Sequence, residues 1–243
     1  MAARLIRIGT AGWSIPAVSR PVFSGSGAQL DRYARIMNAV EINSSFYRPH
    51  QRKTYERWAA STPEDFRFAV KTPRQLTQFQ RMLNPEAVLD AFAGEVSGLG
   101  RKLSVMLVQL PPSLQFDEAV AEHFFAALRE RVTPAVACEP RHRSWFTPEV
   151  DGWLKTRRIA RVAADPAFVP EAAMPGGWHG LTYLRLHGSP RMYWSAYDAA
   201  FLETVARQLA ETKSAAWCVL DNTAHGHALG DAFKLMERLK KGP

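Results

Sequence analysis

Charged and hydrogen-bonding side chains stand at the ends of a series of short apolar runs in this sequence. Glu139 and Glu41 could act as general acid and general base, with His187 as a partner for either carboxyl group. Lys71 and Arg185 could bind an anion such as a phosphate or a carboxylate. The predicted ligand site also includes Asn43, Tyr47, Gln109, Arg141, Trp145, Asp165, Asp221 and Asn222.

The same residues allow two other interpretations. Glu139, Asp165, His187 and Asp221 could supply oxygen and imidazole ligands to a divalent metal ion. No motif with metal-binding spacing supports that set, so no metal or other cofactor is predicted, and a divalent metal remains the alternative. The opposite charges could also form a purely structural network of salt bridges, although pKa shifts in such a ring are typical of ligand sites.

Eight short apolar runs, separated by segments of helical period, position these residues. Their nearly continuous hydrophobicity predicts parallel strands covered on both faces. In barrel enzymes the side chains at the carboxyl ends of such strands converge on one site. The runs are Leu5–Gly9, Ala39–Asn43, Phe66–Lys71, Ser104–Gln109, Ala135–Glu139, Ala160–Asp165, Thr182–His187 and Ala216–Asp221.

Amphipathic segments between most of the runs predict helices. Asn84 before Pro85, Asp117, and Thr147 before Pro148 are expected to cap three of them. The last helix is expected near 228–240. Residues 166–180 contain three prolines and three glycines, which predicts a long loop in place of most of the sixth helix.

The alternation of eight strands with helices predicts an α/β fold, a TIM-type (β/α)8 parallel barrel formed by residues 1–243 as a single domain. The competing fold is an open doubly wound sheet. That fold usually has a G-x-G-x-x-G turn after its first strand. Here the first strand is followed by Thr10-Ala11-Gly12-Trp13, which does not match.

Composition narrows the class of protein. The formal net charge of +8 allows a nucleic-acid partner, although the basic residues form no arm or block. Cys138 and Cys218 lie in apolar runs without C-x-x-C spacing, as is usual for buried thiols in a reducing compartment. No signal peptide and no apolar stretch of about 18 residues is visible, so a cytoplasmic location without a membrane partner is expected.

Seven segments in succession resemble the YecE-like proteins, domain-of-unknown-function family seventy-two. They are IGTAGW (8–13), YARIMNAVEINSSFYR (33–48), FRFAVKTP (66–73), VQLPPS (108–113), CEPRHRSW (138–145), YLRLHGS (183–189) and DNTAHGHA (221–228). The resemblance implies a TIM-type barrel without an established activity. It points to Glu41, Asn43, Phe46, Tyr47, Lys71, Gln109, Glu139, Arg141, Trp145, Arg185, His187 and Gly188.

Two positions depart from the pattern of that family. Family members usually have a Thr-His pair after the lysine that corresponds to Lys71, where this chain has Thr77-Gln78. They often have Asn-Asn after the last strand, where this chain has Asp221-Asn222. A mechanism that needs the missing histidine would therefore not operate here.

The expected function is that of an enzyme acting by acid–base chemistry on a small anionic or polyol-like metabolite at the C-terminal mouth of the barrel. The sequence does not separate a hydrolase from a lyase or an isomerase. The alternatives are a non-catalytic nucleic-acid-binding protein, whose affinity would fall steeply with salt, and a metal-dependent hydrolase or isomerase. The sequence does not indicate the oligomeric state.

Overall fold

The computed structural model describes residues 6–241, which form an α/β fold of ten strands and seven α-helices. Leu5, the first residue of the first predicted run, lies outside the described residues, as do both ends of the predicted domain. Seven of the eight apolar runs match one strand to within one residue at each end, and the sixth run covers two short strands.

The strands form two sheets. One sheet has the order β1–β10–β9–β7 and the other has the order β2–β3–β4–β5–β6–β8. All neighbouring strands are parallel except β6 and β8, which are antiparallel. Their bounds are β1 Ile6–Thr10, β2 Ala39–Ile42, β3 Arg67–Lys71, β4 Leu103–Gln109, β5 Ala135–Glu139, β6 Ile159–Arg161, β7 Ala163–Asp165, β8 Gly176–Gly177, β9 Leu181–Leu186 and β10 Ala215–Leu220.

The sixth predicted strand, Ala160–Asp165, is two short strands rather than one. β6 pairs with β5, whereas β7 pairs with β9 in the other sheet. The change of partner occurs at Val162, whose backbone N–H still donates to the Cys138 carbonyl at 2.8 Å. At the opposite edges, an isolated parallel bridge joins Ala11, just after β1, to Glu41 on β2.

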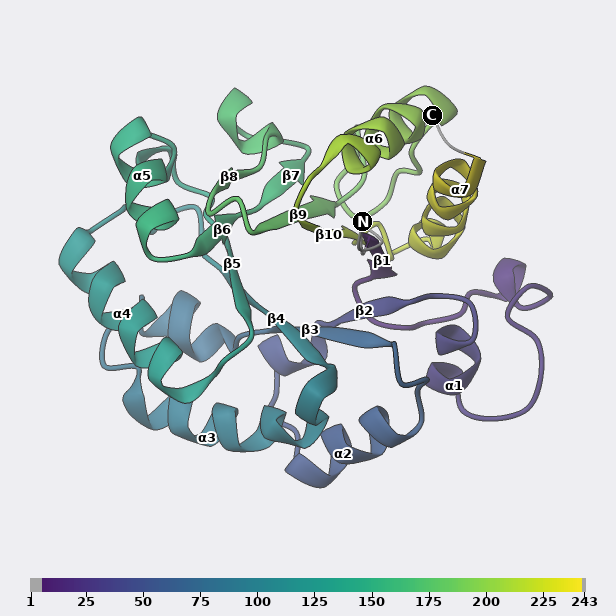
Figure 1. Cartoon of the computed structure of the whole chain (residues 1–243), viewed down its shortest axis with the longest axis horizontal. Helices are drawn as coiled ribbons and strands as arrows, with labels where there is room; N and C mark the ends of the chain where they lie inside the picture. The colour runs from purple at the N-terminus through teal and green to yellow at the C-terminus, as the bar shows by residue number, and fades with distance from the viewer. Residues whose placement is uncertain (1–5, 242–243) are drawn as a thin grey trace.

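Alternate strand residues belong to two different hydrophobic clusters. The larger cluster lies between the strands and the helices and includes Ile8, Val40 and Leu184. The smaller cluster brings together residues of both sheets, among them Ala39, Ala137, Tyr183 and Val219. Figure 1 shows the helices on the outside of the strands, so the smaller cluster defines an inner face.

Seven helices cover the outside: α1 Gln29–Ala34, α2 Arg52–Ala60, α3 Glu86–Val96, α4 Glu118–Arg131, α5 Pro148–Thr156, α6 Ala199–Glu211 and α7 His227–Lys241. Asp117 and Thr147 cap α4 and α5 as predicted, accepting hydrogen bonds from the N–H groups of Val120 and Val150. The predicted cap at Asn84 is wrong. Pro85 occupies the N-cap position of α3, and Asn84 has left-handed backbone angles that place it in the preceding turn.

Residues 166–180, all of them described, contain no α-helix, in agreement with the predicted loop. The segment holds a short 3-10 helix at Pro170–Ala173 and the two-residue strand β8. No helix within residues 6–241 has the length and apolar character needed to cross a membrane.

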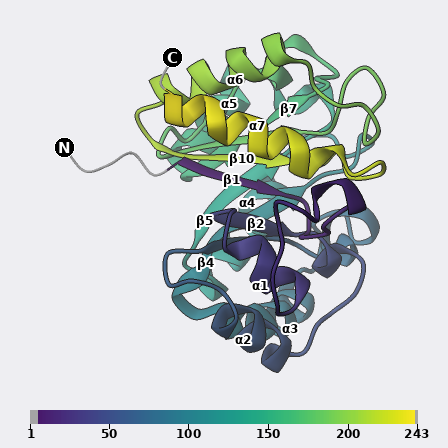
Figure 2. The ribbon, with the colours of Figure 1, turned by 90° about the vertical axis from the view of Figure 1, so that its right-hand side faces the viewer.

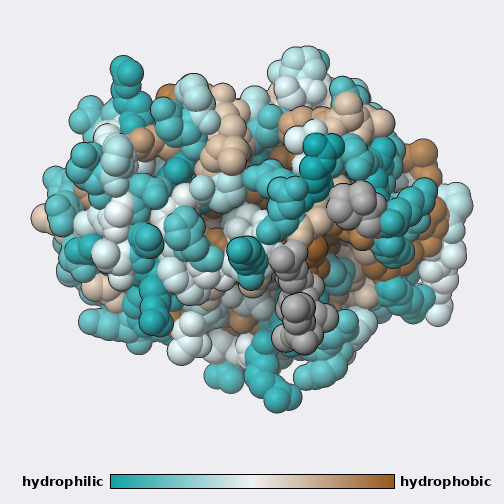
Figure 3. Space-filling view, turned by 45° about the horizontal axis from the view of Figure 1, so that its top comes forward, coloured by the Kyte–Doolittle hydropathy of each residue, from teal (hydrophilic) through white to brown (hydrophobic). Residues whose placement is uncertain are grey.

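The two last helices, α6 and α7, lie side by side along the sheet that contains β1 and β10 (Figures 1 and 2). The face of the molecule seen in Figure 3 is largely hydrophilic, with hydrophobic side chains in separate areas.

Candidate functional site

Five charged side chains continue the inner face beyond its apolar cluster. Glu41, Lys71, Glu139, Arg185 and Asp221 each stand two residues after an inner-cluster residue on the same strand or its direct continuation. Because residues two apart on a strand share a face, these side chains point inward together. They are all buried, and they form the centre of the candidate site.

Arg185 holds three carboxylates around one guanidinium group. Its Nε and one terminal nitrogen donate to Glu41 at 3.1 and 2.8 Å. The other terminal nitrogen, Nη1, donates to Glu139 at 2.6 Å. Nη2, which donates to Glu41, also donates to Asp221 at 2.9 Å. Arg185 is 0% exposed, so its donors face these carboxylates and not solvent.

The second oxygen of Glu139 collects further donors. Glu139 Oε1 accepts from Gln109 Nε2 at 3.0 Å and from Arg141 at 2.9 and 3.0 Å. Burial by itself would raise the pKa of Glu139, but the charges of Arg185, His187 and Arg141 hold that pKa well below its ordinary value. Glu139 is therefore an ionised carboxylate at neutral pH.

His187 bridges Asp221 and Glu139. Its Nδ1 lies 3.1 Å from Asp221 Oδ2, within a hydrogen bond. Its Nε2 lies 3.3 Å from Glu139 Oε1, yet the two groups are not aligned for a hydrogen bond, and this buried nitrogen has no hydrogen-bond partner in the described structure. Burial lowers the pKa of His187, but the charge of Glu139 and the bond to Asp221 outweigh it and raise the pKa above its ordinary value.

Lys71, at the end of β3, has a different environment. Its Nζ lies 4.0 Å from the centre of the Phe46 ring, a cation–π distance, and the residue is 4% exposed. Within residues 6–241, no hydrogen bond or ion pair engages this amine. Burial and the charge of Arg185 lower the pKa of Lys71 to about 8, although Glu41, Glu139 and Asp221 act in the opposite direction.

A cavity of about 220 Å³ opens beside this cluster. Its polar lining is supplied by Glu139, Arg141 and His187, and the Arg141 side chain is 24% exposed. The remaining wall is mostly apolar, with Pro112, Pro140, Val162, Ala164, Pro166, Phe168, Ala172 and Met192. A small ligand here would meet the Arg141 cation, the Glu139 carboxylate paired with it, the His187 imidazole and an apolar surface.

Asp165 and Asn222, both predicted at the site, contact other groups. Asp165 follows Ala163, which belongs to the outer cluster, so the side chain points away from the inner face and accepts from the Tyr197 hydroxyl at 2.8 Å. The inward position at this end of the segment is Ala164, which lines the cavity. Asn222 donates to Asp231 Oδ2 and to a backbone carbonyl, and thus ties the strand end to α7.

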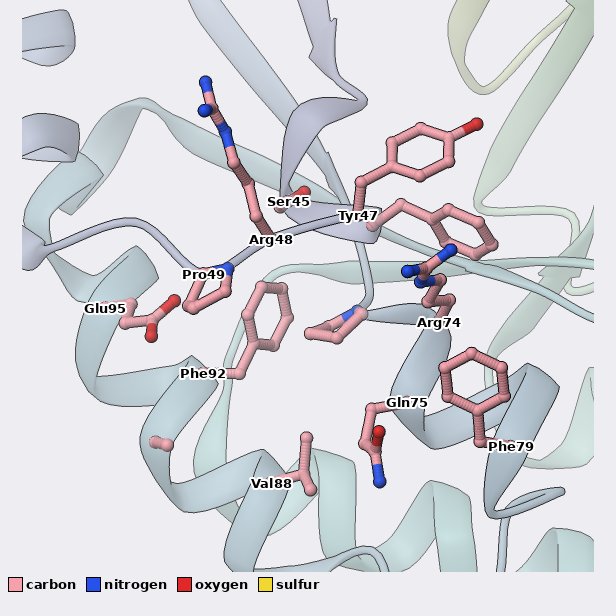
Figure 4. Close-up of a pocket in the computed structure, with 13 residues that line it drawn as sticks. Ser45, Tyr47, Arg48, Pro49, Arg74, Gln75, Phe79, Val88, Phe92 and Glu95 are labelled. Carbon is pink, nitrogen blue, oxygen red and sulfur yellow. The ribbon is translucent and has the colours of Figure 1, made fainter.

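Tyr47 and Trp145 also lie apart from the charged cluster. Tyr47 is 62% exposed and lines a separate pocket of about 310 Å³, in which it lies beside Arg74 (Figure 4). Trp145 is buried, donates to the Leu114 carbonyl at 3.0 Å and stacks edge-on with Phe116. Neither residue lines the 220 Å³ cavity.

Asn43 leaves the inner face just before it would join the site. β2 ends at Ile42, and Asn43 takes helical backbone angles at the start of a 3-10 helix. Its Oδ1 is buried without a hydrogen-bond partner among the described residues.

Residues 6–241 contain no group of three or more His, Cys, Asp or Glu side chains arranged to hold a metal ion.

Tyr183 is a member of the cluster that we did not predict from the sequence. Its hydroxyl donates to Glu41 Oε2 at 2.8 Å, and the residue is fully buried. The available signal was its position two residues before Arg185, on the same face of β9. Its ring packs in the apolar inner cluster, 5.9 Å from the Trp217 ring.

Sequence comparison finds relatives along most of the chain. A family model described as "Protein of unknown function DUF72" matches residues 7–243. The UPF0759 protein YunF of Bacillus subtilis (strain 168) is 26% identical over 214 residues, which are 80% of this chain and 74% of YunF. The UPF0759 protein YecE of Escherichia coli (strain K12) is 29% identical over 167 residues, which are 66% of this chain but only 59% of YecE.

Solved structures of similar fold also come from bacteria. A DUF72 family protein of Enterococcus faecalis V583 superimposes with a TM-score of 0.82 at 18% identity, over 98% of this chain and 97% of that chain. A DUF72 family protein of Thermotoga maritima MSB8 gives a TM-score of 0.78 at 23% identity, over 97% and 99% of the two chains. These likenesses concern the fold.

Proposed function

The chain belongs to the DUF72 family, whose description assigns no activity, and we propose that it is an enzyme acting on a small anionic metabolite. The observation that carries the proposal is the geometry of His187. One ring nitrogen is held by Asp221, while the other has no hydrogen-bond partner in the described structure, and the residue lines a cavity. This is the arrangement of a general acid–base catalyst.

We assign the proton transfer to His187 rather than to a carboxyl group. Glu139 and Asp221 both have pKa values below their ordinary ones, because the charge of Arg185 outweighs their burial. Carboxylates of low pKa are poor proton carriers near pH 7 but stabilise a neighbouring imidazolium. Glu41 is enclosed by Arg185 and Tyr183, so we give it a positioning role.

Arg141 is the better candidate for binding the anion. Arg185 already donates four hydrogen bonds to carboxylates and is fully buried, whereas the partly exposed Arg141 lines the cavity. A guanidinium group suits a carboxylate or a phosphate because its parallel N–H groups match their oxygens. The cavity of about 220 Å³ is at the small end for ligand sites, which favours a metabolite of a few carbon atoms.

We also propose that the two sheets are arcs of one closed (β/α)8 barrel. Support comes from the two junctions: the bridge between Ala11 and Glu41, and the segment from β6 to β7 that pairs with both sheets. In such a barrel the charged cluster would lie at the carboxyl ends of the strands, where enzymes of this fold bind their substrates.

The experiment that tests the function combines binding and turnover. Purified protein is screened by thermal shift against small carboxylates, sugar phosphates, divalent metals and oligonucleotides, because a ligand of the folded state raises the melting temperature. Ligands that bind are then incubated in D₂O, and loss of their C–H signals in proton NMR reports acid–base catalysis.

We expect small anions to stabilise the wild type, and Arg141→Met to abolish this shift while Arg143→Met, a change at an exposed neighbour, preserves it. His187→Gln should retain binding but slow C–H exchange by roughly 10²- to 10⁴-fold, the usual contribution of a positioned acid–base group. A response to oligonucleotides alone, unchanged in both cavity variants, would exclude the enzyme proposal.

A further inference from the structure

Lys71 is buried, and its amine has different contacts from that of the partly buried Lys102. Lys102 Nζ donates to two backbone carbonyls and a hydroxyl, of Ala59 and Thr62, at 2.6 to 3.2 Å. Lys71 Nζ lies 4.0 Å from the centre of the Phe46 ring, and no hydrogen bond or ion pair with another residue in 6–241 engages it. The Lys71 side chain is thus largely buried, whereas its amine has no protein acceptor among the described residues and is not sealed from solvent.

Four charged groups of the inner face act on the charge of Lys71. Glu41 on β2, Glu139 on β5, Arg185 on β9 and Asp221 after β10 all act on its charge. Since Arg185 is already paired with all three of these carboxylates, they compensate the burial of Lys71 only in part. The protonated form of Lys71 is therefore less stable, relative to the neutral amine, than that of a solvent-exposed lysine, and this lowers the pKa.

This environment changes how much reactive amine is present. A pKa of about 8 leaves roughly one Lys71 in ten neutral at pH 7, whereas an ordinary lysine is neutral in about one molecule in 2,500. Only the neutral amine is a nucleophile, and lysines desolvated beside another cation are the ones that react with carbonyl groups.

We propose that Lys71 is a covalent nucleophile, which forms an imine with a small aldehyde or ketone that also carries a carboxylate or phosphate group. This inference rests on the proposed function, because it takes the anion site at Arg141 and the acid–base role of His187 as given. It narrows the substrate of that site from small anions in general to anionic carbonyl compounds.

The chemistry balances with groups of the charged cluster. The lone pair of the Lys71 amine attacks the carbonyl carbon, and the electrons of the C=O bond move to oxygen, which takes up a proton. The nitrogen releases one proton after the attack, which gives the carbinolamine. A second protonation lets the hydroxyl group leave as water, and the nitrogen then releases its remaining proton to give the imine. In this proposal His187, whose raised pKa favours the protonated ring, supplies the proton to the departing oxygen.

A trapping experiment on the complete chain tests this inference. The protein is incubated at pH 8 with pyruvate, glyoxylate or acetaldehyde in the presence of sodium cyanoborohydride, which reduces an imine to a stable secondary amine. Intact-mass spectrometry counts the adducts, and peptide mapping locates them. Acetaldehyde needs no anion site, so it probes the amine independently of Arg141.

We expect one adduct at Lys71 in each chain, at least tenfold more abundant than the adduct at Lys102 in the same sample. Its yield should rise with pH with a midpoint near the Lys71 pKa of about 8. Lys71→Arg should lose the adduct, whereas Lys102→Arg should retain it. Arg141→Met should slow labelling by pyruvate and glyoxylate but not by acetaldehyde.

The failure of this inference differs from a failure of the proposed function. If acetaldehyde labels Lys71 no more than Lys102, the nucleophile assignment is overturned, even where small anions still bind at Arg141. If Lys71 is labelled but Arg141→Met labels equally fast with every probe, the amine is reactive and the assigned anion site is wrong. The Lys71 and Lys102 peptides come from one sample of folded wild type, so no variant has to fold for the first comparison.

Discussion

The guanidinium group of Arg185 is the element on which the charged cluster depends, so Arg185→Met is the most informative change. The substitution has nearly the same length but removes four hydrogen bonds to Glu41, Glu139 and Asp221. These carboxylates are at most 8% exposed at their side chains. They would be left close together in the interior with much of their positive charge gone.

Removing one partner of a buried ion pair costs about 3–5 kcal/mol, because the remaining charge stays buried without compensation. Arg185 compensates three carboxylates, so we expect a loss of stability at pH 7 at or above the lower end of that range. For a chain of 243 residues, each kcal/mol lowers the melting temperature by about 2–4 °C. The melting temperature should therefore fall by roughly 6–20 °C.

The free energy of unfolding of Arg185→Met should change with pH in the direction opposite to that of the wild type. In the wild type, Glu139 and Asp221 have lowered pKa values, so their contribution is present above the unfolded-state pKa and is lost as pH falls through the folded-state pKa. Without Arg185, burial raises these pKa values above those of the unfolded chain. The variant then gains stability from proton uptake below pH 5, and the difference from wild type shrinks.

Urea unfolding followed by tryptophan fluorescence at pH 7 and pH 5 measures both effects. Arg52→Met is the matched control, because its ion pair with Glu56 is exposed and should contribute no more than about 1 kcal/mol. A loss below about 1.5 kcal/mol for Arg185→Met at pH 7 would refute the assigned role of the cluster, given the cost expected for a buried charge. An equal loss at both pH values would refute the electrostatic explanation.

Three further predictions concern a proton, a close backbone approach and two thiols. The His187 ring should titrate above the ordinary value of 6.5 in NMR, so it stabilises the fold at low pH and loses this contribution as pH rises through the raised pKa; Asp221→Asn should lower the midpoint. Gly188→Ala should destabilise by about 1–3 kcal/mol in thermal unfolding, because Gly188 has φ +95° and an added Cβ would lie 2.8 Å from a backbone oxygen; an unchanged melting temperature would contradict this. Cys138 and Cys218 are fully buried with raised pKa values, so a disulfide reagent should label them only on unfolding, and rapid labelling of the native chain would disprove that.

The positions of most strands along the chain could be predicted because the signals for them are local. The run Ala135–Glu139 coincides with β5, and six of the other seven runs differ from their strands by one residue at one or both ends. A parallel strand buried on both faces must be apolar almost throughout, and this leaves a mark in the sequence whatever the partners are. The capping residues Asp117 and Thr147 are equally local, since a cap acts on N–H groups three residues away.

Pairing partners were less accessible. The split of 159–165 into β6 and β7 depends on which strands lie on either side, and the apolar run does not record a change of partner. The same break explains why the Asp165 side chain points away from the predicted site, since Ala164 occupies the inward position there. A difference of one residue in phase moves a side chain to the opposite face of a strand.

The sequence by itself determined which residues could form the charged cluster, because the period of two along each strand places Glu41, Glu139 and Arg185 on one face. Only the tertiary structure decided what each of them does. Arg185 lies among three carboxylates from different strands, whereas the Lys71 amine contacts the Phe46 ring and has no hydrogen-bond acceptor within residues 6–241. Charge and burial act through distances between strands that are far apart in the chain, and those distances are not written in the spacing of the residues.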